Sequence, residues 1–316
     1  MNTKSALLIT FCSVFLVGVV AAMLVIAFVP NAYKPSEDVL TIQNITQTDT
    51  PLNTVGGSVA QGEVQTVQGS YYKEITATAD EGYTFAYWQN SDVKLSGDIK
   101  LTLRATTIDM LNTLASACTP VFVSNENVFL INDIADFNAI LVRDINNGTT
   151  SGKIYKLTQD INSYSNGANA ITLSLNTFSG VLDGNNHAIR DVYINGAGLF
   201  DTIDGGVIKD LILSSGSLNA NNETYIGSFA GSINNGLVSR CVSYLLVSNN
   251  KVDGYAGGMV GVCSSTTTKS MLYSCAFYGT LYSVNSDQMI GSNLKLDNQG
   301  VYACSVFRPK YDGAAA

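Results

Sequence analysis

The order of hydrophobic and polar positions divides the chain into an apolar N-terminal run and a long region of short, alternating runs. Residues 5–29 are nearly all apolar and include no charged side chain. At about 1.5 Å per residue, a helix of this length exceeds the roughly 30 Å hydrocarbon core of a bilayer. Residues 1–30 are therefore predicted to form a transmembrane helix. From residue 55 onward the apolar runs are short and end in Gly, Asn or Ser, a pattern typical of strands.

The apolar run is predicted to be an uncleaved signal-anchor. A cleaved signal peptide is the alternative, but its apolar core is usually about 7–15 residues long and ends at a small-x-small site, and Pro30-Asn31-Ala32 has a poor first position. Lys4 is the only charged side chain before the run, which favours a cytoplasmic N-terminus and an extracellular remainder. The expected location is the cell membrane, crossed once. Residues 31–54, rich in Thr, Gln, Asn and Asp, are predicted to be an extracellular spacer.

Residues 55–123 are predicted to form a small antiparallel β-module. Strand-like alternation starts at Gly56-Gly57-Ser58-Val59 and runs through the aromatic cluster Glu81-Gly82-Tyr83-Thr84-Phe85-Ala86-Tyr87-Trp88. A last strand is expected around Pro120-Val121-Phe122-Val123. Tyr83, Tyr87 and Trp88 have two interpretations, a carbohydrate-stacking platform and the plug of the module's core. A single tryptophan in so small a module favours the core.

This module resembles the divergent internalin-type B-repeat of bacterial surface proteins. The GG-x-V start and the EGY…W cluster carry the resemblance, and Ala86-Tyr87 stands where that family often has Gly before the Trp. The resemblance implies exposure at a bacterial cell surface.

The remainder of the chain repeats itself. Similar segments start at residues 206, 236, 270 and 299, which are 30, 34 and 29 residues apart, with a less regular member at residues 187–192. A second element places glycines at positions 198, 227, 257 and 291, at spacings of 29, 30 and 34. Two independent elements with one shared period predict a solenoid.

The short, strand-like runs predict that this solenoid is a parallel β-helix. Two apolar columns are expected to stack along its inside, with Ser, Thr, Asn and Lys outside. The columns are Ile189/Ile208/Val238/Leu272/Val301 and Val192/Leu211/Cys241/Cys275/Cys304. No proline occurs between Val121 and Arg308, as expected where every strand donates to a neighbouring coil.

Two longer motifs resemble the GLUG-motif repeats of bacterial surface proteins. They are Tyr155-Lys156-Leu157-Thr158-Gln159-Asp160-Ile161 and Phe178-Ser179-Gly180-Val181-Leu182-Asp183-Gly184-Asn185-Asn186-His187-Ala188-Ile189. The resemblance covers about residues 128–307 and implies a right-handed, pectin-lyase-like β-helix, and the predicted domain spans residues 124–308. Residues 309–316 are predicted to be a flexible tail. The apolar spacing of residues 133–147 predicts a helix with Asn132 as N-cap, which would cover the N-terminal end of the solenoid.

Composition restricts the partners and the kinds of catalytic or metal site that we expect. Charged residues make up 13% of the chain and the net charge is −8, so a nucleic-acid partner is not expected. His187 is the only histidine, which rules out multi-His metal sites and most His-based triads within one copy. No catalytic residue, cofactor or metal is predicted, and we do not expect an enzyme.

A polysaccharide lyase or hydrolase remains the alternative among enzymes, because such β-helix enzymes use clustered exterior carboxylates. Asp201, Asp204 and Asp210 could form such a cluster, but solvated turn and edge positions explain them more simply. Asp183-Gly184-Asn185 is interpreted as a turn that supplies positive φ angles, and His187 as a turn histidine beside it.

Five cysteines lie outside the N-terminal run, an odd number. They are Cys118, Cys241, Cys263, Cys275 and Cys304. Three of them recur at one position of the repeat, which favours inward-facing small apolar side chains over a disulfide framework.

Two functional hypotheses follow. The first is a membrane-anchored, adhesin-like surface protein whose β-helix binds glycans, host molecules or neighbouring-cell molecules. The second is a structural spacer or a subunit of a surface assembly. An exposed row of aromatic side chains would favour binding, and an apolar edge or uncapped coil would favour assembly. The oligomeric state and the ligand do not follow from the sequence.

Overall fold

The computed structural model describes residues 54–164, 171, 173–264, 270–287, 289–293, 299–302 and 305–306. The predicted transmembrane helix, the spacer, the tail and Cys304 lie outside these residues. Among the described residues, no helix is both long and apolar enough to cross a membrane. The chain is mainly β, with a small β-module followed by a parallel β-solenoid of about 5 turns.

The module consists of two antiparallel sheets and one helix. The first sheet contains β1 (Gly57–Gln61), β2 (Gln65–Val67), β3 (Ser70–Ala79) and β6 (Lys100–Ala105). The second sheet contains β5 (Val93–Ser96), β4 (Tyr83–Asn90) and β7 (Thr119–Ser124). The predicted antiparallel strands and the last strand at Pro120 are confirmed. The sequence pattern did not predict α2 (Ile108–Ala117), which begins at the N-cap Thr107.

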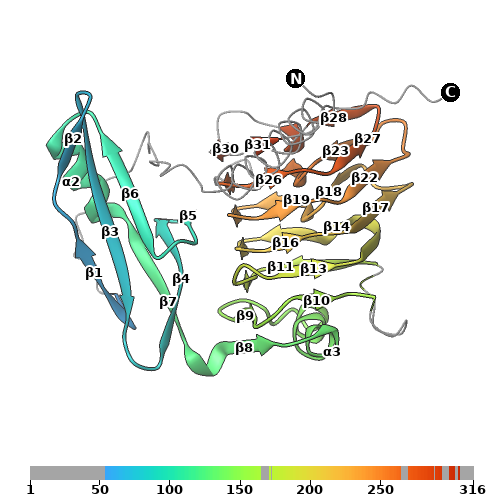
Figure 1. The fold of residues 1–316 in the computed structure, drawn as a ribbon, viewed down its shortest axis with the longest axis horizontal. Helices are drawn as coiled ribbons and strands as arrows, with labels where there is room; N and C mark the ends of the chain where they lie inside the picture. The colour runs from blue at the N-terminus through green and yellow to red at the C-terminus, as the bar shows by residue number, and fades with distance from the viewer. Residues whose placement is uncertain are drawn as a thin grey trace, which may run out of the picture. The chain divides into compact units, whose positions relative to one another are not determined.

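The solenoid stacks five coils through parallel ladders (Figure 1). The first coil contains β9 (Ile154–Leu157), β10 (Ile161–Asn162) and β11 (Leu173–Phe178). The second contains β12 (Val181–Asp183), β13 (Ala188–Arg190) and β14 (Val192–Asp204). The third contains β15 (Val207–Lys209), β16 (Ile212–Leu213), β17 (Gly216–Ala220), β18 (Tyr225–Gly227) and β19 (Ala230–Asn234).

The later coils repeat the third. The fourth contains β20 (Leu237–Ser239), β21 (Val242–Ser243), β22 (Leu246–Asn249), β23 (Tyr255–Gly257) and β24 (Val260–Cys263). The fifth contains β25 (Ser270–Tyr273), β26 (Ala276–Phe277), β27 (Thr280–Tyr282), β28 (Asn285–Asp287) and β29 (Ile290–Asn293). It is followed by β30 (Gln299–Tyr302) and β31 (Ser305–Val306). At the other end β8 (Val128–Ile131) pairs with β9.

The predicted inward columns are confirmed from the third to the fifth coil and wrong at their first members. Ile208, Val238 and Leu272 lie in register and are fully buried. The residue below them is Leu182, because β12 pairs with β15. Ile189 instead pairs with Leu213 in the next sheet. The second coil was misaligned because its long turn after β12 shifts the apolar run by one sheet.

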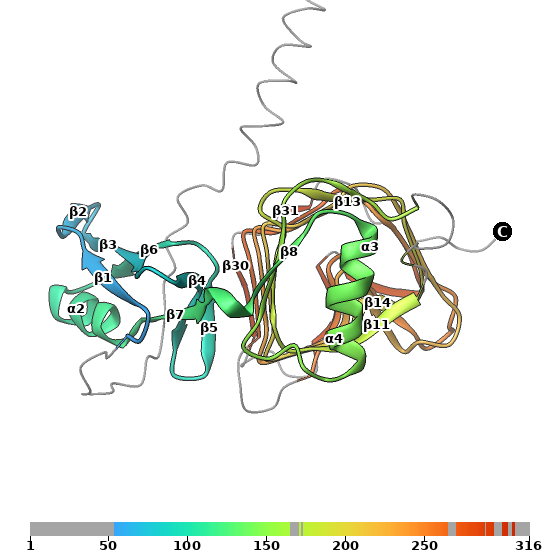
Figure 2. The same cartoon turned by 90° about the horizontal axis from the view of Figure 1, so that it is seen from below.

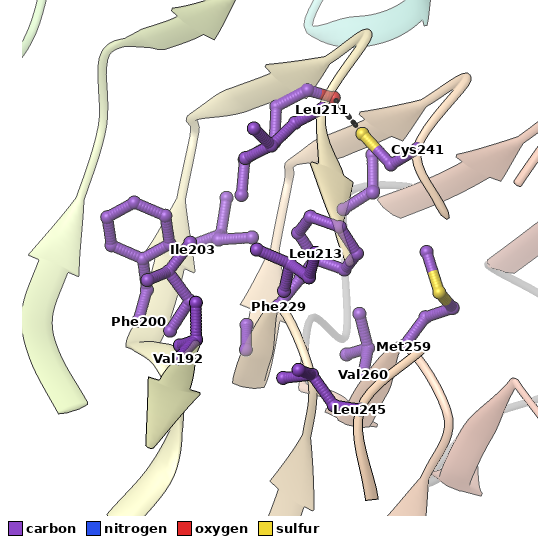
Figure 3. Packing of buried hydrophobic residues seen from close by; sticks show 14 of the residues in the cluster. Val192, Phe200, Ile203, Leu211, Leu213, Phe229, Cys241, Leu245, Met259 and Val260 are labelled. Atoms are coloured by element: carbon purple, nitrogen blue, oxygen red, sulfur yellow. Dashed lines mark hydrogen bonds between the residues drawn. The ribbon is translucent and has the colours of Figure 1, made fainter. Parts of the chain in front are cut away.

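The interior is apolar throughout the stack (Figure 3). Phe200 and Phe229 lie in this core with Cys241 and Met259, and all four side chains are fully buried. Phe178 stacks on Phe200 with ring centroids 4.7 Å apart. Aromatic stacking between successive coils adds specific contacts to the burial of apolar surface.

Glycines allow two strands of each coil to approach closely. Gly227 pairs with Gly257, which pairs with Asp287. Gly291 therefore does not belong to this column, contrary to the predicted alignment, and the spacing is a uniform 30 residues. A Cβ on Gly257 would lie 1.9 Å from the carbonyl oxygen of Val260. Only glycine fits at this position of the fourth coil, whereas the fifth coil has Asp287 at the equivalent position.

A helical segment covers the N-terminal end of the coils (Figure 2). It contains α3 (Ile134–Asp136), a π-helical stretch (Phe137–Val142) and α4 (Arg143–Asn146), and its apolar side chains join the solenoid core. The predicted capping helix is thus present, but its N-cap is Asp133, whose side chain accepts a hydrogen bond from the Asp136 amide, and not Asn132. The aspartate carboxylate satisfies an amide that the first helical turn leaves unpaired.

One outer face of the solenoid is apolar, against the prediction of a polar exterior. The residues that alternate with the inward column of β9, β12, β15, β20 and β25 belong to one buried cluster with Trp88 and Leu95 of the module. These outer residues are Ile154, Val181, Val207, Leu237 and Met271. Polar contacts add to the cluster, since Arg240 pairs with Asp98 at 3.2 Å and Lys94 donates to the carbonyl oxygen of Asn235 at 3.0 Å. The module therefore covers surface that would otherwise be exposed and apolar.

Candidate ligand-binding face

A second outer face of the solenoid is exposed and carries tyrosines among small polar residues. It is formed by the first part of β14 with β17, β22 and β27, which pair in parallel. Its inward positions are buried, as shown by Ile194, Leu218 and Val247. The alternating outward positions define what we call the tyrosine face. They are Tyr193, Asn195, Ser217, Asn219, Leu246, Ser248, Thr280 and Tyr282.

The tyrosine face has no charged side chain at any of these eight positions. Tyr193 is 47% exposed and Tyr282 is 41% exposed. Tyrosine offers a large, rigid apolar ring with a polar tip at low entropic cost, and Asn, Ser and Thr offer hydrogen-bond donors and acceptors. The face can therefore combine ring stacking with neutral hydrogen bonding.

Further tyrosines stand at the corner between β21 or β26 and this face. Tyr244 follows β21 and Tyr278 follows β26, so they occupy equivalent places in the fourth and fifth coils. Their rings stack with centroids 5.0 Å apart and planes 11° apart. Burial, with a smaller contribution from Tyr244, raises the pKa of the Tyr278 phenol above its ordinary value. The Tyr278 phenol is therefore neutral at physiological pH.

A second aromatic pair lies at the first two coils, between residues outside the corner column. Tyr164 and Tyr193 meet edge to face, with centroids 6.1 Å apart. The third coil lies between the two pairs and carries Ser214 at the position equivalent to Tyr244. At the position equivalent to Tyr244 the first and second coils carry Asn162 and Arg190, so the aromatic column at the corner is confined to the fourth and fifth coils.

The far edge of the face is held by a ladder of polar loops. Lys251 donates to the Thr224 hydroxyl at 2.7 Å and to the Asn222 carbonyl at 3.2 Å. The buried Asn249 amide donates to the Glu223 carbonyl at 3.2 Å. These bonds tie the loop of the fourth coil to that of the third, so the edge of the tyrosine face is rigid.

The structure separates the carboxylates that were considered as an enzyme-like cluster. Asp210 accepts two hydrogen bonds of 2.6 Å from Arg240. Asp204 accepts a bond of 2.8 Å from Asn234, and Asp201 lies on an exposed position of β14. Asp210 and Asp204 therefore have different hydrogen-bond partners.

The Asp183-Gly184-Asn185 segment is a turn, as predicted, but its glycine does not supply the positive φ angles. The Asp183 carboxylate accepts from the Asn185 amide at 2.8 Å, and the positive φ angles belong to Asn185 and Asn186. Gly184 is required by space, because its Cβ would lie 2.4 Å from the carbonyl oxygen of Asp210. His187 lies beside this turn with its Nδ1 3.5 Å from Asp160.

The aromatic cluster of the module does not form an exposed platform around its tryptophan. Trp88 is fully buried, and Phe85 packs against it with ring centroids 6.0 Å apart. Burial raises the pKa of the Tyr87 phenol. The interpretation of Trp88 as the core plug is confirmed, and its role as a stacking surface is wrong.

The four described cysteines outside the N-terminal run are interior side chains. Cys241 and Cys275 lie in the solenoid core at equivalent positions of successive coils. Burial raises the pKa of the Cys118 and Cys263 thiols to about 12. Such thiols are protonated at neutral pH and lack the thiolate character of reactive cysteines.

Comparison with known proteins supports the module and adds one distant relative. Residues 50–122 match the family described as the divergent InlB B-repeat domain, in agreement with the predicted module. A stretch of 163 residues is 29% identical to halomucin of Haloquadratum walsbyi, over 45% of this chain and 2% of that protein. The chain thus spans a very small part of that relative's length. No solved structure matches the chain significantly.

The tyrosine face was missed by the sequence patterns. Its residues are dispersed over four strands, and their alternation with buried positions predicts a strand but no binding surface. A usable signal was present, however, because Tyr244 and Tyr278 each stand three residues after a column cysteine. Equivalent places in successive coils lie side by side, so this recurrence indicated an aromatic pair.

Proposed function

We propose that this protein is a membrane-anchored surface protein whose β-solenoid acts as an adhesin-like binding module for glycans, host molecules or neighbouring-cell molecules. The tyrosine face is the observation that carries the proposal. The match to the B-repeat domain and the similarity to halomucin support a surface location. We also infer that the solenoid is of the right-handed GLUG type, on the motifs that start at Tyr155 and Phe178.

The contrast between two outer faces of the solenoid argues for binding. The apolar face formed with Val207 and Leu237 is buried under the module, whereas Tyr193 and Tyr282 remain exposed on the tyrosine face. Exposed aromatic side chains among polar residues are typical of recognition surfaces, where aromatic anchors contribute most of the binding energy.

The anchor assigned to residues 1–30 and the spacer assigned to residues 31–54 fit this proposal. A signal-anchor would hold the chain at the cell membrane, and the spacer would separate the folded region from the bilayer. The module and solenoid share one buried cluster, so they would present the tyrosine face as a single rigid part.

An adhesion assay with the full chain tests the proposal. The chain, inserted in fluorescent vesicles, is offered to beads of cellulose, chitin or mannan and to cell monolayers. We expect retention on at least one surface, and at least about tenfold weaker retention for the double variant Tyr193→Ser/Tyr282→Ser. The matched control is Tyr225→Ser/Tyr255→Ser, because those two rings also stack between coils, with centroids 5.5 Å apart, but lie on β18 and β23. No retention of the wild type, or equal loss in both variants, would overturn the proposal.

A structural spacer is the second candidate, and the buried cluster shared by module and solenoid is the observation that favours it. A spacer needs rigidity and no ligand. Under this hypothesis neither pair of tyrosines matters for retention, and both double variants would change only thermal stability.

A further inference from the structure

We propose that the side chains of Lys209 and Asp183 condense into an amide bond that joins the second and third coils of the solenoid. Nζ of Lys209 becomes linked to Cγ of Asp183, and one molecule of water is released. This cross-link does not depend on the proposed binding function, because it concerns how the coils are held together.

The two side chains face each other across neighbouring coils. Asp183 ends β12, Lys209 ends β15, and the two residues are direct partners in the parallel register. Their side chains are 12% and 6% exposed. Because the ladder holds both residues at neighbouring positions, the amine and the carboxyl meet without the entropic cost of an encounter.

The Lys209 ammonium is poorly satisfied for a buried charge. Nζ lies 3.6 Å from Oδ2 of Asp183 and 3.5 Å from the carbonyl oxygen of Gly97. Among the residues that the structure describes, it has no shorter polar contact, although ammonium–carboxylate contacts are usually about 2.7–2.9 Å long. Lys153, by contrast, meets Asp144 at 2.8 Å. Buried charges without close partners are costly, and an amide bond would remove both charges.

The module excludes water from the pair. Nζ of Lys209 lies 5.3 Å from the centroid of the Phe85 ring, and a Cβ on Gly97 would lie 2.8 Å from Cδ of the same lysine. Burial lowers the pKa of the Lys209 ammonium, although the charges of Asp183 and Asp210 oppose this shift. A lower pKa increases the fraction of neutral amine, which is the nucleophilic form, and a dry site favours the loss of water.

The Asp183 carboxyl is oriented for attack at its carbon atom. Oδ1 accepts a hydrogen bond of 2.8 Å from the Asn185 amide, and Oδ2 is the oxygen nearest to Nζ. Asp210 is already engaged by Arg240 through two bonds of 2.6 Å. Asp183 is therefore the carboxylate that is left to react with Lys209.

The condensation balances without a further reactant. The ammonium first transfers one proton to Oδ2, and the neutral amine then attacks Cγ. The bond from Nζ to Cγ forms while an electron pair moves onto Oδ1, where the Asn185 amide stabilises the negative charge. When the double bond to Oδ1 forms again, the bond from Cγ to Oδ2 breaks. Oδ2 takes a second proton from Nζ and leaves as water.

Tryptic mapping of the detergent-solubilised full chain tests the proposal. The protein is unfolded, digested with trypsin and analysed by mass spectrometry. We expect no cleavage after Lys209, so that peptide 157–190 is found joined to peptide 191–240, with a combined mass lower than their sum by one water molecule. An ordinary ion pair would instead give separate peptides 157–190 and 191–209. Recovery of only these separate peptides from the wild type would overturn the proposal.

Three variants locate the bond. Asp183→Ala should allow cleavage after Lys209, and Lys209→Arg should restore the mass of one water molecule to the intact chain beyond the change due to the substitution. Lys153→Arg, at the closely paired lysine, should keep the cross-link. A cross-link that persists in Asp183→Ala would show that Lys209 is joined elsewhere and would also overturn the proposal. The peptides of the wild type decide the question even if a variant fails to fold.

Discussion

The phenol of Tyr155, in the first coil, donates a hydrogen bond of 2.8 Å to the Asp144 carboxylate, in the helix that covers the end of the solenoid. Lys153 pairs with the same carboxylate at 2.8 Å and Arg143 at 3.0 Å. The Asp144 side chain is 4% exposed. One buried carboxylate therefore fixes the capping helix to the coil beneath it, and the cap protects the first ladder of the stack.

Replacement of Asp144 should destabilise the fold in a pH-dependent way. Burial alone would raise the pKa of this carboxyl, but hydrogen bonds from Lys153, Tyr155 and Arg143 outweigh it and hold the pKa below its ordinary value. The stabilisation is then complete above the unfolded pKa of about 3.9 and is lost as the pH falls through the lower folded value. We expect Asp144→Ala to cost about 3–5 kcal/mol at pH 7, measured by urea unfolding.

Tyr155→Phe is the matched variant for this network. It removes one hydrogen bond and leaves both cationic partners of Asp144, so it should cost about 1 kcal/mol. The difference in stability between wild type and Asp144→Ala should shrink when unfolding is repeated near pH 3. A pH-independent difference would show that the carboxylate charge does not hold the cap.

A polar substitution under the module should uncouple it from the solenoid. Leu237 is fully buried in the cluster shared by the two parts, so Leu237→Asp would bury an unpaired charge or open the contact. We expect one calorimetric transition for the wild type and two for Leu237→Asp. Leu246→Asp, on the tyrosine face of the same coil, is the control and should keep one transition. An undivided transition in Leu237→Asp would mean that the contact contributes little.

A methyl group at Gly257 should disturb the stack more than one at a glycine with open surroundings. The Cβ would lie 1.9 Å from the Val260 carbonyl oxygen and 2.6 Å from the Gly291 amide nitrogen, so Gly257→Ala should cost about 3 kcal/mol or more. Gly148 has a φ of 65° and no atom within 4 Å of a Cβ, so Gly148→Ala should cost only the left-handed strain, about 1–2 kcal/mol. Thermal unfolding measures both, and equal effects would contradict the steric explanation.

The sequence was sufficient to predict the solenoid, because a period shared by two elements can hardly arise outside a repeat. It also placed the burial of Trp88 and the inward position of Cys241 correctly. It failed at the second coil, since register depends on turn length as well as on apolar spacing. Gly291 was misplaced because the fifth coil has Asp287 at the position of Gly257, and the next glycine, Gly291, belongs to the following strand β29.

Sequence patterns could not predict the composition of the two outer faces, and the reason is physical. Val207 and Leu237 are apolar on the outside because the module covers them, and alternation cannot separate such a strand from one buried in a core. The tyrosine face combines residues 193–282 from four strands, and their proximity follows only from the register. The functional proposal therefore required the structure, which shows which residues share a face.

The central claim is that the tyrosine face is the binding surface, and hydroxyl-radical footprinting tests it most directly. The full chain is oxidised free and while retained on the bead or cell surface that holds it best, and modification is read for each tyrosine by mass spectrometry. We expect at least about threefold protection of Tyr193 and Tyr282 on binding, with Tyr225 and Tyr255 unchanged. Protection of Tyr225 and Tyr255 without protection of Tyr193 and Tyr282 would contradict the account.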